Sequence, residues 1–243
     1  MKEYISPHCR IQGCAGSEKC RNAVIDYDSI LEDISLTAKK IEFPSYNSDV
    51  SENKILSHRL FSMSASFCPN ACSRPQIADF GIIASSIVQV TDAGCTGCNA
   101  CIESCREDAI RFPTPATPEI IREKCLHCGS CSSSCPSGTI SVFKTGYRIF
   151  IGGMMGRHPM LAAELPHIYD RDTVIELFKI CFEIYNDLFY SGLRFRNMIL
   201  RYPEKLPISL REIFLTALNG ESRIKSDTSK QQQTVTLSEE NYK

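Results

Sequence analysis

Residues 95–110 read CTGCNACIESCREDAI, and residues 125–140 read CLHCGSCSSSCPSGTI. The two stretches match cysteine for cysteine, and each has the spacing C-x2-C-x2-C-x3-C. Four thiolates at this spacing are typical of a 4Fe-4S cluster, and in a double motif the fourth cysteine of each run ligates the other cluster. We therefore expect two clusters, held by Cys95, Cys98, Cys101 and Cys135 in the first case and by Cys105, Cys125, Cys128 and Cys131 in the second.

This repeat resembles a bacterial two-cluster ferredoxin, and we expect it to form a module over residues 91–145. The connector between the halves, FPTPATPE at 112–119, is too rich in proline to be a helix interior. Proline follows Cys135, as in those ferredoxins, whereas Arg106 follows Cys105 and lacks the fixed φ of proline. A zinc ribbon is the alternative, because C-x2-C pairs also bind zinc, but two complete quartets favour iron–sulfur.

A third set of four cysteines is split along the chain. Cys14 and Cys20 have the spacing C-x5-C, and Cys68 and Cys72 have the spacing C-x3-C. Together the three sets take twelve of the fourteen cysteines. The tight spacings within each set favour metal ligation over a disulfide framework, which suits short secreted chains.

Composition limits the other classes of function. The chain has 243 residues, of which 43% are hydrophobic, so it can bury one medium domain and a small one. A net charge of −1 does not favour nucleic acid or an anionic membrane as the main partner. No stretch approaches the roughly 18 uninterrupted apolar residues of a membrane span, and the first ten residues lack the apolar core of a signal peptide. We expect a reducing, anaerobic cytoplasm.

Hydrophobic patterning outside the repeat predicts both helices and strands. Apolar residues recur at helical spacing over 28–40 and again after Asp172, which can cap the second helix. The face of that second helix includes Cys181, which we expect in the core rather than at a metal. Strands are expected within 80–90 and at 147–151. Residues 221–243 are polar, and we expect a disordered tail.

Two further segments are informative when they are taken together with the split cysteines. Residues 67–82 read FCPNACSRPQIADFGI, and residues 147–159 read YRIFIGGMMGRHP. Together with the split cysteines they resemble the sirohaem-dependent sulfite and nitrite reductases, above all the anaerobic and dissimilatory sulfite reductases. Several members of that family carry a ferredoxin module between these segments. The resemblance implies an α+β fold, in which a mixed-sheet reductase domain (1–90 and 146–220) holds an inserted ferredoxin module.

The same resemblance implies a mechanism. Cys14, Cys20, Cys68 and Cys72 would hold a third 4Fe-4S cluster, and the Cys72 thiolate would also be the axial ligand of a sirohaem iron. Electrons would pass singly through that sulfur. Sulfite, or nitrite as the alternative substrate, would be reduced on the open face of the iron, and sulfite reduction to sulfide takes six electrons.

Sirohaem carboxylates and an anionic substrate both require cations, and arginine suits planar, bidentate contacts best. Arginines flank the motifs at Arg10, Arg21, Arg74 and Arg157. For each of them an ordinary solvated surface arginine is an equally good interpretation.

Three functional hypotheses remain open at this point. The first is a sulfite or nitrite reductase, or its catalytic subunit. The second is an electron-transfer subunit with three clusters and no sirohaem, and the third is a sirohaem-binding protein without turnover. Only about a dozen residues precede Cys14, so we expect the family's preceding half-domain to be absent. An electron-donor protein and a homologous or complementary subunit are the expected partners.

Overall fold

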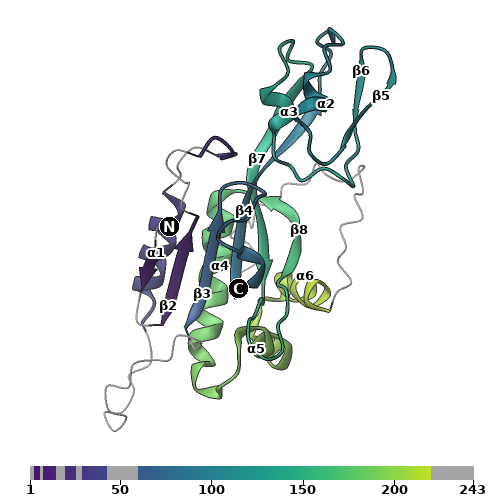
Figure 1. Cartoon of the computed structure of the whole chain (residues 1–243). Helices are drawn as coiled ribbons and strands as arrows, with labels where there is room; N and C mark the ends of the chain where they lie inside the picture. The colour runs from purple at the N-terminus through teal and green to yellow at the C-terminus, as the bar shows by residue number, and fades with distance from the viewer. Residues whose placement is uncertain (1–2, 6–7, 15–19, 26–28, 43–59, 220–243) are drawn as a thin grey trace.

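The computed structural model describes residues 3–5, 8–14, 20–25, 29–42 and 60–219. Its centre is a six-stranded sheet in the order β1-β2-β3-β4-β7-β8 (Figure 1). The strands are β1 (Glu3–Ile5), β2 (Cys9–Gly13), β3 (Phe61–Ser66), β4 (Phe80–Val90), β7 (Ile140–Ile151) and β8 (Ala163–Tyr169). The pairs β2–β3 and β3–β4 are parallel, and the other three are antiparallel. The expected α+β class with a mixed sheet is confirmed.

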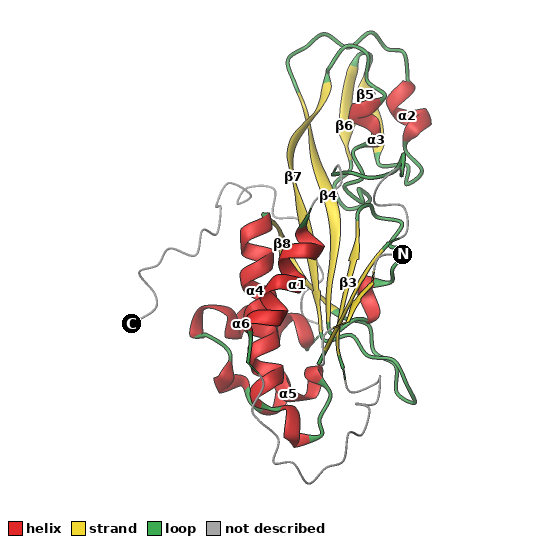
Figure 2. Cartoon of the chain, turned by 90° about the vertical axis from the view of Figure 1, so that its left-hand side faces the viewer, coloured by secondary structure: helices red, strands yellow, loops and turns green. Residues whose placement is uncertain are grey.

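Helices cover one face of this sheet (Figure 2). They are α1 (Ile30–Lys40), α4 (Arg171–Asp187), α5 (Phe195–Arg201) and α6 (Ile208–Leu218), with the short 3-10 turns η3 (Phe189–Ser191) and η4 (Pro203–Lys205). A further 3-10 turn, η2 (Pro75–Ile77), lies between β3 and β4 in the sequence. Phe61 of β3 is fully buried between the helices and contacts the rings of Phe178, Phe182 and Phe195. This aromatic cluster fixes α4 and α5 against the centre of the sheet.

The opposite face of the sheet is polar where β3 crosses it. Ser62, Ser64 and Ser66 alternate with the core residues Phe61, Met63 and Ala65 along the strand, as the two-residue period of a strand requires. The segment that contains η2 covers this polar face. A Cβ at Gly81 would lie 2.2 Å from the Pro75 carbonyl oxygen, so only glycine lets that segment approach β4.

The ferredoxin-like repeat lies at the end of a long two-stranded ribbon. β4 and β7 pair from Phe80 opposite Ile151 to Val90 opposite Ile140. Between them the chain forms α2 (Ala100–Ser104), β5 (Ile110–Thr114), β6 (Thr117–Ile120) and α3 (Ser130–Ser133). The prediction that 80–90 and 147–151 lie together is confirmed. β7 begins earlier than expected because it keeps pairing with β4 up to the repeat.

Three other expectations have mixed outcomes. The predicted cap at Asp172 is wrong: the Asp170 carboxylate caps α4 by accepting a hydrogen bond of 2.9 Å from the Thr173 N–H. The prediction for Cys181 is confirmed, since it is fully buried in the core on α4. The tail predicted over 221–243 lies outside the described residues.

Within the described part of the chain, every helix is too short or too polar to cross a bilayer.

Candidate iron–sulfur centres

The two halves of the repeat share an unusual backbone. Three positions in each half have a left-handed conformation, with φ between 50° and 75°. In matching order they are Gly97 and His127, Asn99 and Gly129, and Asp108 and Gly138. Left-handed backbone is costly for residues other than glycine and persists where the surroundings demand it. Each half therefore winds its cysteines around a centre in the same way, and each then enters a short helix, α2 or α3.

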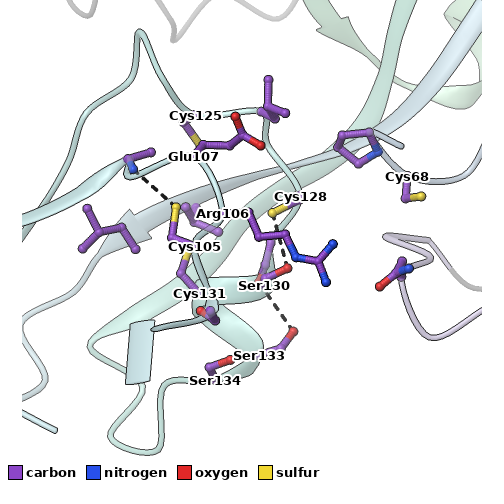
Figure 3. A pocket seen from close by; sticks show the side chains of 18 of the residues that line it. Cys68, Cys105, Arg106, Glu107, Cys125, Cys128, Ser130, Cys131, Ser133 and Ser134 are labelled. Atoms are coloured by element: carbon purple, nitrogen blue, oxygen red, sulfur yellow. Dashed lines mark hydrogen bonds between the residues drawn. The ribbon is translucent and has the colours of Figure 1, made fainter. Parts of the chain in front are cut away.

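The thiols of the repeat lie in two groups of four, and each group includes the fourth cysteine of the other half. Burial, and then the nearby Cys135 and Cys95, raise the pKa of Cys101. Burial raises the pKa of Cys131 to about 11, and the neighbouring charges of Cys125, Cys128 and Cys105 add to that rise. We call these groups the first quartet (Cys95, Cys98, Cys101, Cys135) and the second quartet (Cys105, Cys125, Cys128, Cys131). Each quartet lines its own cavity, and Figure 3 shows that of the second.

Backbone N–H groups point at several of these sulfurs. Ala109 donates to Cys105 Sγ and Ile140 donates to Cys135 Sγ, each at 3.4 Å. The Ile140 bond is the main cause of a lowered pKa at Cys135. Such bonds stabilise thiolate charge and tune the potential of a cluster that the sulfur holds.

The split cysteines meet at one end of two parallel strands. Cys14 follows β2 and donates its N–H to the Ala65 carbonyl at 3.0 Å, while Cys68 lies two residues beyond β3. Parallel neighbours end at the same edge of a sheet. Burial raises the pKa of Cys68, and the thiol charges of Cys20, Cys72 and Cys14 raise it further. The structure thus brings together all four residues of this set, which we call the split quartet.

Cys72 differs from the other members of the split quartet. It is exposed, whereas Cys14 and Cys68 are buried and Cys20 is half-buried. The residue after it, Ser73, is 5% exposed and makes four hydrogen bonds to β3. Cys72 therefore presents its sulfur to the outside from a fixed backbone.

The four candidate arginines lie in different places. Arg21 lines the cavity of the second quartet, near Cys68. Arg10 is exposed on β2, and its Nε donates to Glu3 Oε1 at 2.6 Å. Arg74 and Arg157 are exposed, the first with left-handed backbone and the second in the loop after β7. Only Arg21 shares a cavity with the cysteines.

Two features of this region go beyond the sequence-based expectations. Ser73 anchors Cys72, and the alternating serines Ser64 and Ser66 of β3 were the signal for its partners. The paired glycines after β7 serve internal packing, because a Cβ at Gly153 would lie 2.6 Å from the Ala78 carbonyl oxygen. Gly153 also donates its N–H to that oxygen at 2.8 Å. The segment after β7 that contains Gly153 is thereby hydrogen-bonded to the segment that carries Cys72.

The donor sets fit iron–sulfur clusters. All fourteen cysteines are free thiols, so no disulfide competes for them. Among the described residues, no three His, Cys, Asp or Glu side chains converge closely enough to hold a single metal ion. Four thiolates per set are the number that a cube of four irons requires.

Comparison with known proteins places these features in a family. Residues 6–202 match the family model described as "Nitrite and sulphite reductase 4Fe-4S domain". The coenzyme F420-dependent sulfite reductase of Methanocaldococcus jannaschii is 31% identical over 146 residues, which are 59% of this chain and 21% of that protein. An anaerobic sulfite reductase subunit of Salmonella typhimurium is 40% identical over 43 residues, which are 18% of this chain and 13% of that protein. The chain therefore spans about a fifth or less of the length of these relatives.

A solved structure supports the fold. The crystal structure of dissimilatory sulfite reductase I superposes with a TM-score of 0.51 at 13% identity. The superposition covers 95% of this chain and 56% of that one.

Proposed function

The chain belongs to the nitrite and sulphite reductase 4Fe-4S family, and from this premise we propose that it is the cluster-bearing unit of a sirohaem-dependent sulfite reductase. The three quartets would hold three 4Fe-4S clusters. Residues 91–145 would act as an inserted ferredoxin module, and residues 1–90 with 146–220 as the reductase domain. A reducing cytoplasm suits this cofactor set.

The observation that carries the proposal is the position of Cys72. Its sulfur is exposed at the edge of a quartet whose other members are buried or half-buried. A thiolate placed in this way could be shared between a cluster on its inner side and a second iron-containing group on its exposed side. Sirohaem, when bound there, would supply an iron that takes up the substrate and a macrocycle that accepts single electrons.

The chain's own residues have separate tasks in this proposal. Ser73 would keep the Cys72 backbone in place, and Arg21, Arg10, Arg74 and Arg157 are the candidates to bind the macrocycle carboxylates and the anion. A homologous or complementary subunit would complete the anion site, and a separate protein would deliver electrons.

Nitrite is the alternative substrate, and an electron-transfer subunit without sirohaem is the second candidate function. The two quartets of the repeat favour electron transfer in either case. The family match favours the reductase, because the model that residues 6–202 fit is described as that of a nitrite and sulphite reductase 4Fe-4S domain.

The visible spectrum of the anaerobically purified full chain tests this function. The reductase predicts strong red-region bands of sirohaem, together with oxidation of reduced methyl viologen that depends on sulfite. Iron–sulfur absorption without red bands, after co-expression with sirohaem synthesis, would favour the electron-transfer subunit instead. Parallel assays with nitrite would separate the two substrates.

A further inference from the structure

One cavity joins the ferredoxin-like repeat to the split quartet. It has a volume of about 400 Å³ and is lined by all four cysteines of the second quartet. Its other wall comes from the chain around the split quartet and includes Arg21, Cys68 and Asn70. In Figure 3 Cys68 lies across this space from Cys128, with the Arg106 side chain extending between the two regions.

The cavity of the first quartet is lined by a different set of residues. Its cavity is lined by its own four cysteines and by residues of the repeat such as Phe112, Pro118 and Ile140. Among the residues that the structure describes, none of the split quartet or of the segment around it lines that cavity, and neither does any charged side chain. The two quartets therefore differ in what they face, although their backbones match.

The same asymmetry appears in the way the repeat rests on the sheet. The Ser86 N–H of β4 donates to the His127 carbonyl at 2.6 Å, and Ser86 pairs with Cys128 in an isolated bridge. A Cβ added at Gly129 would lie 3.2 Å from the Ser86 side chain. In the first half Asn99 holds the position of Gly129, and a Cβ added two residues earlier, at Gly97, would meet no atom within 4 Å. The loop of the second quartet is thus packed against the sheet, and the matching loop of the first is open.

We propose that the chain fixes the order of electron flow: electrons enter at the first quartet, cross to the second, and leave the repeat across the wall between Cys128 and Cys68. This inference rests on the proposed function. Single electrons from a low-potential one-electron donor move along this path, and the donor is oxidised by one electron for each one delivered. No bond to carbon or sulfur changes during these transfers.

Matched cysteine variants test the order. Cys98→Ala and Cys128→Ala remove equivalent ligands from the two quartets, because the residues hold equivalent positions in the repeat. Pulsed EPR of the dithionite-reduced full chain would measure the spin relaxation of the split-quartet cluster, which a nearby paramagnetic cluster accelerates. Cys128→Ala should abolish this acceleration, and Cys98→Ala should retain it. The opposite pattern would overturn the order.

A measurement on the unsubstituted protein guards against variants that fail to fold. Pulsed dipolar spectroscopy of the reduced chain should give a shorter distance from the split-quartet cluster to the second-quartet cluster than to the first. If all three cluster signals are present but the distance to the first-quartet cluster is the shorter one, this inference is overturned and the proposed function stands. Absence of a third cluster signal in iron-replete protein would overturn both.

Discussion

The hydroxyl oxygens of Ser66 and Ser73 lie 2.7 Å apart and connect the last residue of β3 to the segment of Cys72. The Ser73 hydroxyl donates to the Ala65 carbonyl at 2.6 Å, so Ser66 supplies the proton of the shared bond. The Ser64 hydroxyl donates to the Ser73 carbonyl at 2.6 Å. Both serines of the shared bond are buried, and the bonds therefore form in a site from which water is excluded.

Ser73→Ala should loosen the split quartet. The change leaves the proton of the Ser66 hydroxyl without its buried acceptor, at a cost of about 1–3 kcal/mol for an unsatisfied group, whereas the Ala65 carbonyl keeps the Cys14 N–H. We expect a lower melting temperature and loss of iron from the split quartet alone, with about eight irons kept in the repeat. The exposed Ser133→Ala is the control. Equal iron content in the two variants would contradict this role for Ser73.

Iron removal should loosen the repeat far more than the sheet. The apolar core of the repeat is small, and much of it is made of cysteines such as Cys101 and Cys131. The core between sheet and helices contains large aromatic residues such as Phe61 and Phe178 and needs no metal. We expect about twelve cluster irons in the full chain, and one more with sirohaem. After chelation, limited proteolysis should cut first within 91–145, and early cleavage of α4 would argue against this division.

Cys72→Ser should affect sulfite reduction without affecting the reduction of the clusters of the repeat. If Cys72 binds both the third cluster and sirohaem, the variant should lose sulfite reduction and show shifted sirohaem bands. The clusters of the repeat should still be reduced by dithionite, because their ligands are intact. Cys181→Ser is the matched control, since Cys181 is fully buried on α4 and should cost only stability. Full activity with unchanged bands in Cys72→Ser would refute the assignment.

Asp79→Asn should change how stability depends on pH. Burial raises the pKa of the Asp79 carboxyl, although hydrogen bonds from Ser62 and the nearby Arg194 oppose the rise. A carboxyl whose pKa is higher in the folded protein than in the unfolded one makes the fold less stable as pH rises. This loss of folding free energy begins near the ordinary pKa, about 3.9, and is complete above the pKa of the folded state. Asparagine does not titrate, and its amide oxygen can still accept from Ser62.

The melting temperature of Asp79→Asn should therefore exceed that of the unsubstituted chain at pH 8, and the gap should shrink toward pH 4. Thermal unfolding followed by circular dichroism at several pH values measures this gap. The exposed Asp172→Asn should show no comparable pH-dependent gap. A gap at Asp79 that stays constant with pH would show that the carboxyl is not the cause.

Local sequence determined much of this molecule. Ligand spacing acts over a few residues, so the cysteine pattern predicted the quartets, and the structure brings Cys135 near Cys101 and Cys105 near Cys131. That these thiols hold clusters stays a prediction. Hydrophobic periodicity likewise placed α1, β4 and the core position of Cys181. These features follow from contacts between near neighbours or from burial of one face, which a sequence records directly.

Tertiary structure decided what depends on contacts between distant segments. The sequence predicts the cap of α4 at Asp172, whereas the extended backbone at Asp170 brings the Asp170 carboxylate to the Thr173 N–H. The two halves of the repeat are nearly equivalent as sequences, so nothing in them tells which quartet faces Cys68. That choice follows from the packing of Ser86 against the loop of Cys128, which the register of β4 and β7 sets.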